Sequence, residues 1–514
     1  MPYAVVTVAA FGDSFGGIGN IWEGLTVIAL THTADVSDLT YTTADGEVTI
    51  TDCNTKASGE LVIPDTIEGN PVTSIGVGAF FVCRSLTTIT LPESVTSIGD
   101  NAFEDCTSLT SITLPDGVTR LGGRAFYNCN RLTSVTLPDS VTRLGDDVFY
   151  NCSSLTSITI PDSVTRLGTS AFNGCSSLTS VTIPDSVTSI GDEVFYNCTR
   201  LPRITLPDGV TSIGTSVFNG CTSLTSITIG NGVTRIGDRA FSSCSSLPSI
   251  MIPDGVTSIG ESAFENCTSL TSITIGNGVT SIGNYAFERC NSLPSITIPD
   301  SVTSIGTSVF NGCSSLTSIT IGNGVTSIGD DAFSNCSSLT SITIPDGVTS
   351  IGDRAFSDCS SLTSITIGNG VTSIGNYAFE RCSNLTRIIF RGETPSIGSD
   401  LFFGVDEHTV IRALAFGAKR KDTQITQLEA QLAAMTAERD ARFTEDQIIA
   451  MSADSIIGMN DAGKVEMKIN FFESADLVTF APFTVTPESV SVVDGNICLE
   501  FTPRHAAFFR FSLR

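Results

Sequence analysis

The sequence predicts a β-rich repeat solenoid, because two residue types recur with one fixed period. Fourteen cysteines follow one another at intervals of 23 residues, from Cys83 to Cys382. A phenylalanine precedes each of them by three residues, and one more stands in register at Phe402. Such a period is typical of a solenoid, in which one supersecondary unit stacks on copies of itself. Fifteen turns are therefore expected.

The first half of each turn predicts two short strands. In one representative turn, Ile158 and Ile160 alternate with Thr159, as in a strand with one buried face. Pro161 and the aspartate after it end that strand, and a second β-rich stretch covers residues 164–167. Stacked copies of this unit would pair each strand with its equivalents in parallel sheets.

The second half of each turn predicts a short helical turn. A glycine opens it in every turn, as Gly168 does here, which indicates either a positive φ or a close backbone approach. Ala171, Phe172 and Cys175 then have the spacing of one helical turn that points inward. Three turns carry proline directly after the leading leucine, so strand pairing is expected to begin after that position; these prolines are Pro202, Pro248 and Pro294.

The cysteine column predicts a ladder of free, buried thiols. Equivalent side chains in a stack lie about 4.8 Å apart and point the same way, whereas a disulfide needs Cβ atoms about 3.8 Å apart that face each other. Each thiol is therefore expected to act as a small buried hydrophobe. Cys53 and Cys498 lie outside this ladder, and their pairing stays open.

Composition excludes several partners. The net charge is −26, so phosphate backbones and anionic membranes should be repelled, and nucleic acid is not expected as a partner. The chain contains no run of about 20 apolar residues that would span a bilayer as a helix. Residues 1–34 are either an atypical signal segment or an N-terminal extension, because a short apolar stretch occurs there without preceding Lys or Arg.

The unit resembles the BspA-like leucine-rich repeat family. The motifs are Leu-x-x-Ile-x-Ile-Pro, then Val-Thr-Ser-Ile-Gly, then Ala-Phe-x-x-Cys, as over residues 339–359, and residues 59–76 resemble the first turn of that family. The resemblance covers about residues 40–404 and implies a right-handed, modestly curved solenoid and protein binding at the cell surface without catalysis. We expect the solenoid itself over 76–404. An open end would expose apolar side chains and strand edges, so an N-terminal capping turn is expected over 35–75 and a C-terminal cap over 390–416. One departure concerns the asparagine that common leucine-rich repeats carry after the strand, since Ser163 and Gly209 stand there.

The outward strand positions repeat with little variation, and few carry the residue types that dominate binding hot spots. Six residues in the N-terminal third are exceptions and are the candidates for ligand contact: Arg120, Arg143, Arg166, Tyr127, Tyr150 and Tyr196. The alternative interpretation is solvated surface variation among recently duplicated turns.

Two further regions follow the repeats. Residues 405–447 predict a linker and a charged helix, whose apolar spacing suits a short coiled coil or a helix packed on a neighbour; the spaced residues are Ile425, Leu428, Leu432 and Met435. Residues 448–514 alternate apolar and polar side chains and predict a small β module.

A catalytic reading is remote. Residues 11–20 resemble the first block of GDSL-type esterases, with Ser14 as the nucleophile, and residues 458–461 resemble a later block. The required Asp-x-x-His is missing, because Val405 and Thr502 stand where the aspartate should precede a histidine. No other catalytic, cofactor or metal motif is found, so no cofactor or metal is expected.

The sequence thus favours a non-enzymatic scaffold for protein binding or adhesion, located outside the cell or at its surface. Many near-identical weak contacts would raise the affinity for a repetitive, host or extracellular protein. Glycan binding by the serine and threonine columns is the alternative.

Overall fold

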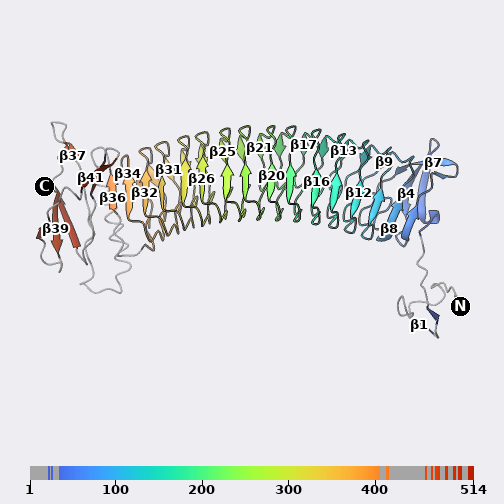
Figure 1. The fold of residues 1–514 in the computed structure, drawn as a ribbon, viewed down its shortest axis with the longest axis horizontal. Coiled ribbons are helices and arrows are strands. Elements are labelled where there is room, and N and C mark those ends of the chain that lie inside the picture. Colours follow the sequence, from blue (N-terminus) through green and yellow to red (C-terminus); the bar gives the residue numbers. More distant parts are fainter. Residues whose placement is uncertain are drawn as a thin grey trace. The chain divides into compact units, whose positions relative to one another are not determined.

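The structure is a computed structural model that describes residues 34–405 and, outside them, the backbone of short strands (Figure 1). The chain divides into two compact units, Met1–Gly324 and Val325–Arg514. Within residues 34–405 the secondary structure is almost entirely β, and one 3-10 helix, η3 (Val36–Asp38), precedes the first strand of that range. The predicted solenoid of stacked β turns is thus confirmed.

The first strand face of unit 1 is formed by the Leu-x-x-Ile segments of successive turns. Its strands pair in parallel, and each residue pairs with the equivalent residue of the next turn, as Ile158 does with Val181. They form five separate sheets: β5 (Ser58–Val62), β8 (Ser85–Thr90), β10 (Ser111–Thr113) and β12 (Ser134–Thr136); β14 (Ser157–Thr159) and β16 (Ser180–Thr182); β18 (Arg203–Thr205) and β20 (Ser226–Thr228); β22 (Ser249–Met251) and β24 (Ser272–Thr274); β26 (Ser295–Ile298) and β28 (Ser318–Ile321).

The second strand face of unit 1 is formed by the Val-Thr-Ser-Ile segments and falls into two sheets. The first contains β3 (Leu39–Ala44), β4 (Glu47–Cys53), β7 (Asn70–Ile75), β9 (Ser97–Ile98), β11 (Arg120–Leu121), β13 (Arg143–Leu144), β15 (Arg166–Leu167) and β17 (Ser189–Ile190), with β6 (Thr66–Ile67) beside β7. The second contains β19 (Ser212–Ile213), β21 (Arg235–Ile236), β23 (Ser258–Ile259), β25 (Ser281–Ile282) and β27 (Ser304–Ile305). β3 and β4 form an antiparallel hairpin, and β4 pairs in parallel with β7.

Unit 2 repeats the same two faces. Its first strand face contains β30 (Ser341–Thr343), β32 (Ser364–Ile367), β34 (Arg387–Phe390) and β36 (Arg412–Ala415). Its second strand face contains β29 (Ser327–Ile328), β31 (Ser350–Ile351), β33 (Ser373–Ile374) and β35 (Ser396–Ile397).

The remaining strands lie near the two ends of the chain. β1 (Ile21–Trp22) pairs with β2 (Leu25–Thr26). Toward the C-terminus, antiparallel pairing joins β37 (Gly458–Met459) to β38 (Val465–Glu466), β39 (Ile469–Ser474) to β40 (Ala481–Phe483) and β43 (Phe508–Leu513), and β41 (Val490–Val493) to β42 (Asn496–Leu499). The predicted helix lies outside the described residues, and the C-terminal β module stays a prediction.

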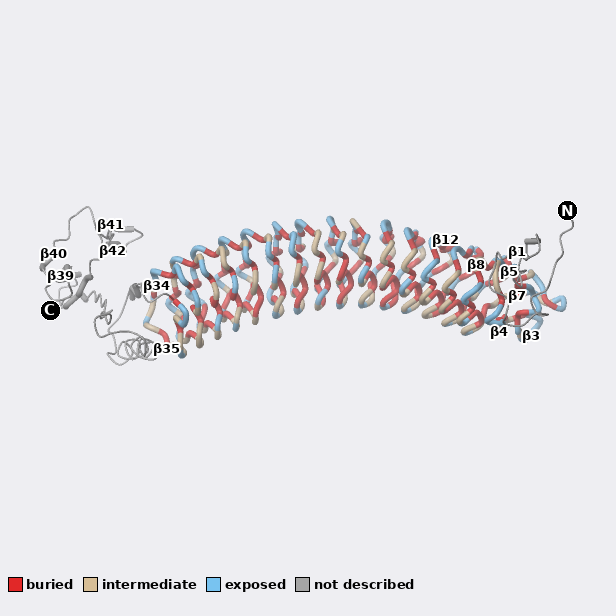
Figure 2. Tube along the Cα trace, turned by 90° about the horizontal axis from the view of Figure 1, so that it is seen from below, coloured by how far each residue is buried: buried red, intermediate tan, exposed pale blue. Residues whose placement is uncertain are grey.

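The interior of each turn is filled by the repeated apolar columns, and buried and exposed residues alternate along the chain trace (Figure 2). The phenylalanines that recur every 23 residues in unit 1, from Phe80 to Phe310, are fully buried. Neighbouring rings stack with centroids between 5.1 and 5.6 Å apart, as in Phe80–Phe103 and Phe149–Phe172 through to Phe195–Phe218. The core is therefore continuous along the stack within this unit.

The expected short helical turn is wrong. In the turn from Gly99 to Cys106, Asn101 and Asp105 have φ angles of 59° and 60°, in the left-handed region that ends a helix. The N–H groups of Asn101, Phe103 and Asp105 donate to carbonyls of the following turn, at 2.8–2.9 Å. Alternate N–H groups thus bond along the stack, and those of Glu104 and Cys106 donate to carbonyls three residues earlier, so no regular helix forms. We call residues between the repeated glycine and cysteine the turn face.

The repeated glycine is required by close approach, and a positive φ is not the reason. A Cβ atom on Gly168 would lie 2.5 Å from the carbonyl carbon of Gly145, and one on Gly145 would lie 2.8 Å from that of Gly122. Neither residue has a positive φ. Side chains are thus excluded because the backbones of successive turns touch at this column.

The three prolines explain three of the breaks in the first strand face. Each precedes a strand, as predicted: Pro202 before β18, Pro248 before β22 and Pro294 before β26. In other turns the residue here donates to the preceding turn, as the N–H of Thr179 does to the carbonyl of Thr156 at 2.9 Å. Proline has no N–H, so the ladder ends before each of these strands.

At Pro202 the second strand face is interrupted as well, because β17 and β19 belong to different sheets. The turn face still bridges this junction, since Phe195 donates to the carbonyl of Val217 at 2.9 Å. We expect Pro202→Thr to restore a donor and to slow amide exchange at 179–183 about fivefold, the value of one hydrogen bond of about 1 kcal/mol. Hydrogen exchange with mass spectrometry measures this, and unchanged exchange would show that proline does not open the junction.

The thiol ladder is confirmed. All fourteen repeated cysteines and Cys53 are free and buried. Each thiol from Cys106 onward, where the contact is described, donates to the carbonyl of a phenylalanine 26 residues earlier, for example Cys221 to Phe195 at 3.1 Å. Burial raises the pKa of the Cys221 thiol to about 12. The column therefore holds neutral, hydrogen-bonded thiols.

Alkylation should distinguish folded from unfolded protein sharply. Iodoacetamide at neutral pH should label none of the fifteen described cysteines in the native state, because reaction needs an accessible thiolate. After denaturation under reducing conditions it should label all of them. Intact-mass measurement counts the adducts, and native labelling of several ladder cysteines would contradict the burial seen here.

Candidate functional site

The hydroxyl groups of the repeated outward threonines donate hydrogen bonds along the stack. The Thr156 hydroxyl donates to the carbonyl of Thr133 at 3.3 Å, and that of Thr179 donates to the carbonyl of Thr156 at 3.0 Å. The Thr257 hydroxyl on the second strand face does the same to Thr234, at 3.1 Å. These threonines therefore stabilise the stack, and their donors are not offered to a ligand.

The asparagine ladder of common leucine-rich repeats is absent from the sequence, but serine and aspartate side chains make hydrogen bonds along the stack. The Ser163 hydroxyl donates to the carbonyl of Val141 at 2.6 Å. Asp146 Oδ1 accepts the N–H of Thr169 at 2.9 Å, and equivalent carboxylates recur along the turn face. Sequence reasoning missed these bonds, although an aspartate directly after the repeated glycine in several turns, such as Asp100, Asp146 and Asp192, was a signal that could have indicated them.

The turn face is where the turns differ from one another. Its variable positions hold the half-buried Arg124 and Tyr127 in one turn, but the buried Ser170 and Asn173 in another. Left-handed residues at two positions of each turn set the path of the chain on either side of the buried phenylalanine. The face is thus a regular backbone frame that presents variable side chains.

Two of the predicted tyrosines meet there. Tyr127 and Tyr150 stack with ring centroids 4.6 Å apart and planes 6° from parallel. The Arg124 guanidinium carbon lies 4.1 Å from the Tyr127 centroid, as in a cation–π contact. Arg124 also approaches the Glu104 carboxylate at 3.6 Å, and the Glu104 side chain is only 11% exposed. These four residues, 104, 124, 127 and 150, form the tyrosine cluster.

The other candidates occupy separate places. Tyr196 lies two turns beyond Tyr150, with Asn173 between them in the same column. Asn173 donates to Glu193 at 3.1 Å and is buried. Ring stacking in this column is described for Tyr127 and Tyr150, so the structure brings together two of the three tyrosines.

The three arginines lie on adjacent strands of the second strand face. Arg143 and Arg166 are direct register partners, and Arg120 is on the strand beside Arg143. Together we call them the arginine row. The row belongs to the strand face, whereas the tyrosine cluster belongs to the turn face, so five of the six candidates fall into two separate sites and Tyr196 lies apart from both.

Burial changes the pKa of two groups at or beside the tyrosine cluster. Burial raises the pKa of Asp147, although the nearby Arg124 guanidinium opposes this. Burial also raises the pKa of Tyr150, helped by the neighbouring Tyr127 and Asp147. The tyrosine thus stays a neutral hydroxyl that can donate to or accept from a partner. Sequence reasoning missed Arg124 and Glu104, although Arg124 precedes Tyr127 by three residues in the same turn.

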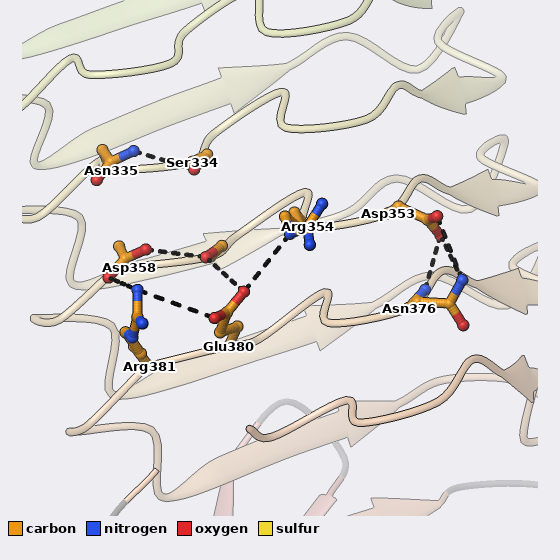
Figure 3. A network of polar contacts seen from close by, with 9 residues as sticks. Ser334, Asn335, Asp353, Arg354, Asp358, Asn376, Glu380 and Arg381 are labelled. Carbon is orange, nitrogen blue, oxygen red and sulfur yellow. Dashed lines mark hydrogen bonds and ion pairs between the residues drawn. The ribbon is translucent and has the colours of Figure 1, made fainter. Parts of the chain in front are cut away.

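Unit 2 carries a comparable set of contacts (Figure 3). Arg354 lies over the Tyr377 ring at 5.1 Å and approaches the Glu380 carboxylate at 3.6 Å. Arg381 bridges Asp358 and Glu380 at 3.7 and 3.9 Å. A cation–π pair with a carboxylate is therefore found on the turn face of each unit.

A groove of about 380 Å³ lies on the first strand face of unit 1. It is lined by residues 179–183 of one turn and residues 203–205 of the next. It coincides with the junction at Pro202, where the strands β16 and β18 do not pair. None of the six candidates lies in it.

Other chemistry is not assembled in the described part of the chain. There, no three His, Cys, Asp or Glu side chains are placed to hold a metal ion. Within the same residues, no helix has the length and apolar character needed to cross a membrane. Ser14 and the three histidines fall outside the described residues.

Known proteins identify the repeat. The model of the BspA type leucine rich repeat region matches residues 59–179, 168–294 and 280–409. A leucine-rich repeat protein from Bacteroides ovatus is 33% identical, with a TM-score of 0.65, over 74% of this chain and 98% of that one. A leucine rich cell surface protein from Faecalibacterium prausnitzii is 32% identical, with a TM-score of 0.39, over 69% and 94%. No functionally curated protein is detectably similar. The chain belongs to the BspA-type leucine-rich repeat family.

Proposed function

We propose that this protein is a non-enzymatic scaffold that binds a protein partner at the cell surface or outside the cell. Proteins of its family are typically non-enzymatic repeat scaffolds found at cell surfaces. The observation that supports the proposal most directly is that different parts of each turn have different roles. The repeated columns fill the core or bond along the stack, whereas the turn face varies more and carries the tyrosine cluster.

The tyrosine cluster suits a protein contact. Stacked tyrosines offer a large, rigid apolar surface with hydroxyls at its edge, and arginine beside them adds charge-assisted bonding. Arg124 and Glu104 fix each other, so little side-chain entropy is left to lose on binding. A partner with repeated epitopes would gain further affinity from other turns on the same body.

Binding of candidate extracellular proteins by the full chain tests this proposal. The double variant Tyr127→Ser, Tyr150→Ser should weaken binding by about tenfold or more, because hot-spot truncations cost about 2 kcal/mol. Serine is structurally acceptable, since Ser242 and Ser334 occupy the same column. The matched control is Thr159→Ser on the first strand face. A partner that both variants bind as tightly as the unaltered chain would remove the cluster from the proposal.

Glycan binding remains the second candidate, and one observation favours it. Ser157 and Thr159 of β14 are both exposed, and β16 repeats them at Ser180 and Thr182, so hydroxyls form two parallel columns. A glycan array separates the two functions. A glycan signal that is lost in the double variant Ser157→Ala, Thr159→Ala but kept in the tyrosine variant would favour glycan attachment.

The remote esterase hypothesis has its own test. Ester hydrolysis that disappears in Ser14→Ala would contradict a non-enzymatic role.

A further inference from the structure

The arginine row concentrates positive charge on an acidic protein. β11, β13 and β15 are neighbours in one parallel sheet, so equivalent Cα atoms lie about 4.8 Å apart. Arg120, Arg143 and Arg166 are all exposed. Three guanidinium groups therefore follow one another along the second strand face of a chain whose net charge is −26.

Only the first member of the row has a described ion pair. Arg120 lies 3.9 Å from Asp100 of the preceding turn. For Arg143 the equivalent position is Gly123, which has no side chain. For Arg166 the equivalent position is Asp146, and the Oδ1 atom of Asp146 accepts a hydrogen bond from the N–H of Thr169. Among the described residues, neither Arg143 nor Arg166 has a carboxylate within ion-pair distance.

Stability of the stack does not explain this arrangement. Like charges on directly paired strand positions are destabilising, and Arg143 and Arg166 are such a pair. The same column holds Ser97 on β9 and Ser189 on β17, which flank the row on either side. A serine would therefore fit every place in the row without the repulsion.

We propose that the arginine row binds an acidic segment of a protein partner, and this rests on the proposed function. Guanidinium groups recognise carboxylates through paired, charge-assisted hydrogen bonds. Acidic residues three or four positions apart on a helix lie about 5–6 Å from one another, close to the spacing of the row. A short acidic segment fits better than a long polyanion, because the surrounding surface is acidic and repels negative charge.

The test uses the full chain and a labelled helical peptide with glutamates at every fourth position, with its glutamine counterpart as the reference. The glutamate peptide should bind the unaltered chain more tightly than the glutamine peptide, and added salt should weaken it. The triple variant Arg120→Ser, Arg143→Ser, Arg166→Ser removes all three guanidinium groups of the row. It should bind the glutamate peptide about tenfold or more weakly than the unaltered chain does. The control is Arg235→Ser, a lone arginine in the same column between Ser212 and Ser258, which should change nothing.

The triple variant should melt at the same temperature as the unaltered chain or higher, which shows that it folds. The proposal would be overturned if the unaltered chain bound both peptides equally well, or if the triple variant bound the glutamate peptide as tightly as the unaltered chain does. A sulfated oligosaccharide that binds the row when the glutamate peptide does not would also overturn it and assign the row to sulfate. A protein partner that the triple variant retains but the tyrosine variant loses would leave the scaffold function standing without the row.

Discussion

The repeats should unfold as the pH rises above about 9, and the transition should coincide with ionisation of the buried thiols. All fourteen ladder cysteines are buried. Burial raises the pKa of Cys221, Cys267 and Cys313 from 9.0 to about 12. Ionisation in place would also turn each thiol from a donor into an anion facing the phenylalanine carbonyl to which it now donates, as Cys221 faces Phe195.

The direction follows from proton linkage. Between the unfolded and folded pKa values, the folded chain keeps its thiol protons while the unfolded chain has lost them. The stabilisation is therefore complete below the unfolded value and is lost as the pH rises toward the folded one. Each thiol loses about 1.4 kcal/mol per pH unit in this window. The eleven ladder thiols whose pKa is raised by burial would therefore lose about 15 kcal/mol over one unit, the upper end of the usual stability of a domain, about 5–15 kcal/mol.

Circular dichroism and thiolate absorbance, recorded together under reducing conditions, measure this transition. The matched variant replaces several ladder cysteines by valine, which occupies the cysteine column naturally at Val405. Fewer titrating thiols should move the transition to higher pH. Thiolate absorbance that rises near pH 9 while the β signal stays intact would show that the thiols are accessible in the folded chain.

Much of the fold could be predicted from the sequence because its columns report burial directly. The cysteine and phenylalanine registers predicted the core. The glycine column predicted either a positive φ or a close approach of backbones, and the close approach is what occurs at Gly168. The turn face could not be predicted as non-helical. Left-handed positions there hold residues as different as Asn101, Arg124 and Tyr285, because bonds to the next turn impose that geometry whatever the side chain.

The candidate sites show a similar limit. Choosing Arg and Tyr by column did find a row on neighbouring strands and a stacked pair, since columns become neighbours in a stack. Contacts that run between different columns were missed. Glu104 reaches Arg124 from the turn before it, and Arg124 covers Tyr127. These contacts depend on how the chain reverses within the turn face, which no single column reveals.

Deleting residues 35–75 should convert the protein into aggregates. The β3–β4 hairpin and the strands β5 and β7 end the stack on its N-terminal side, and they bury Val48, Ile50, Leu61 and Val72. Without them, β8 and β9 each lose the partner on one side, and bare strand edges pair readily with other chains. The next turn would also expose Phe80, because its ring would lose the cover of this segment.

Deleting residues 1–34 is the matched control. The described link that this deletion breaks is one backbone bond, from the N–H of Ala34 to the carbonyl of Ser58 at 2.9 Å. That truncated chain should remain a soluble monomer with an unchanged β signal, whereas the 35–75 deletion should elute as large species in size-exclusion chromatography with light scattering. Each buried aliphatic side chain removed with the cap forfeits about 1.5–3 kcal/mol of burial. A monomeric, native-like 35–75 deletion would therefore mean that the remaining turns need no cap, and that polar strand edges alone keep the stack from growing.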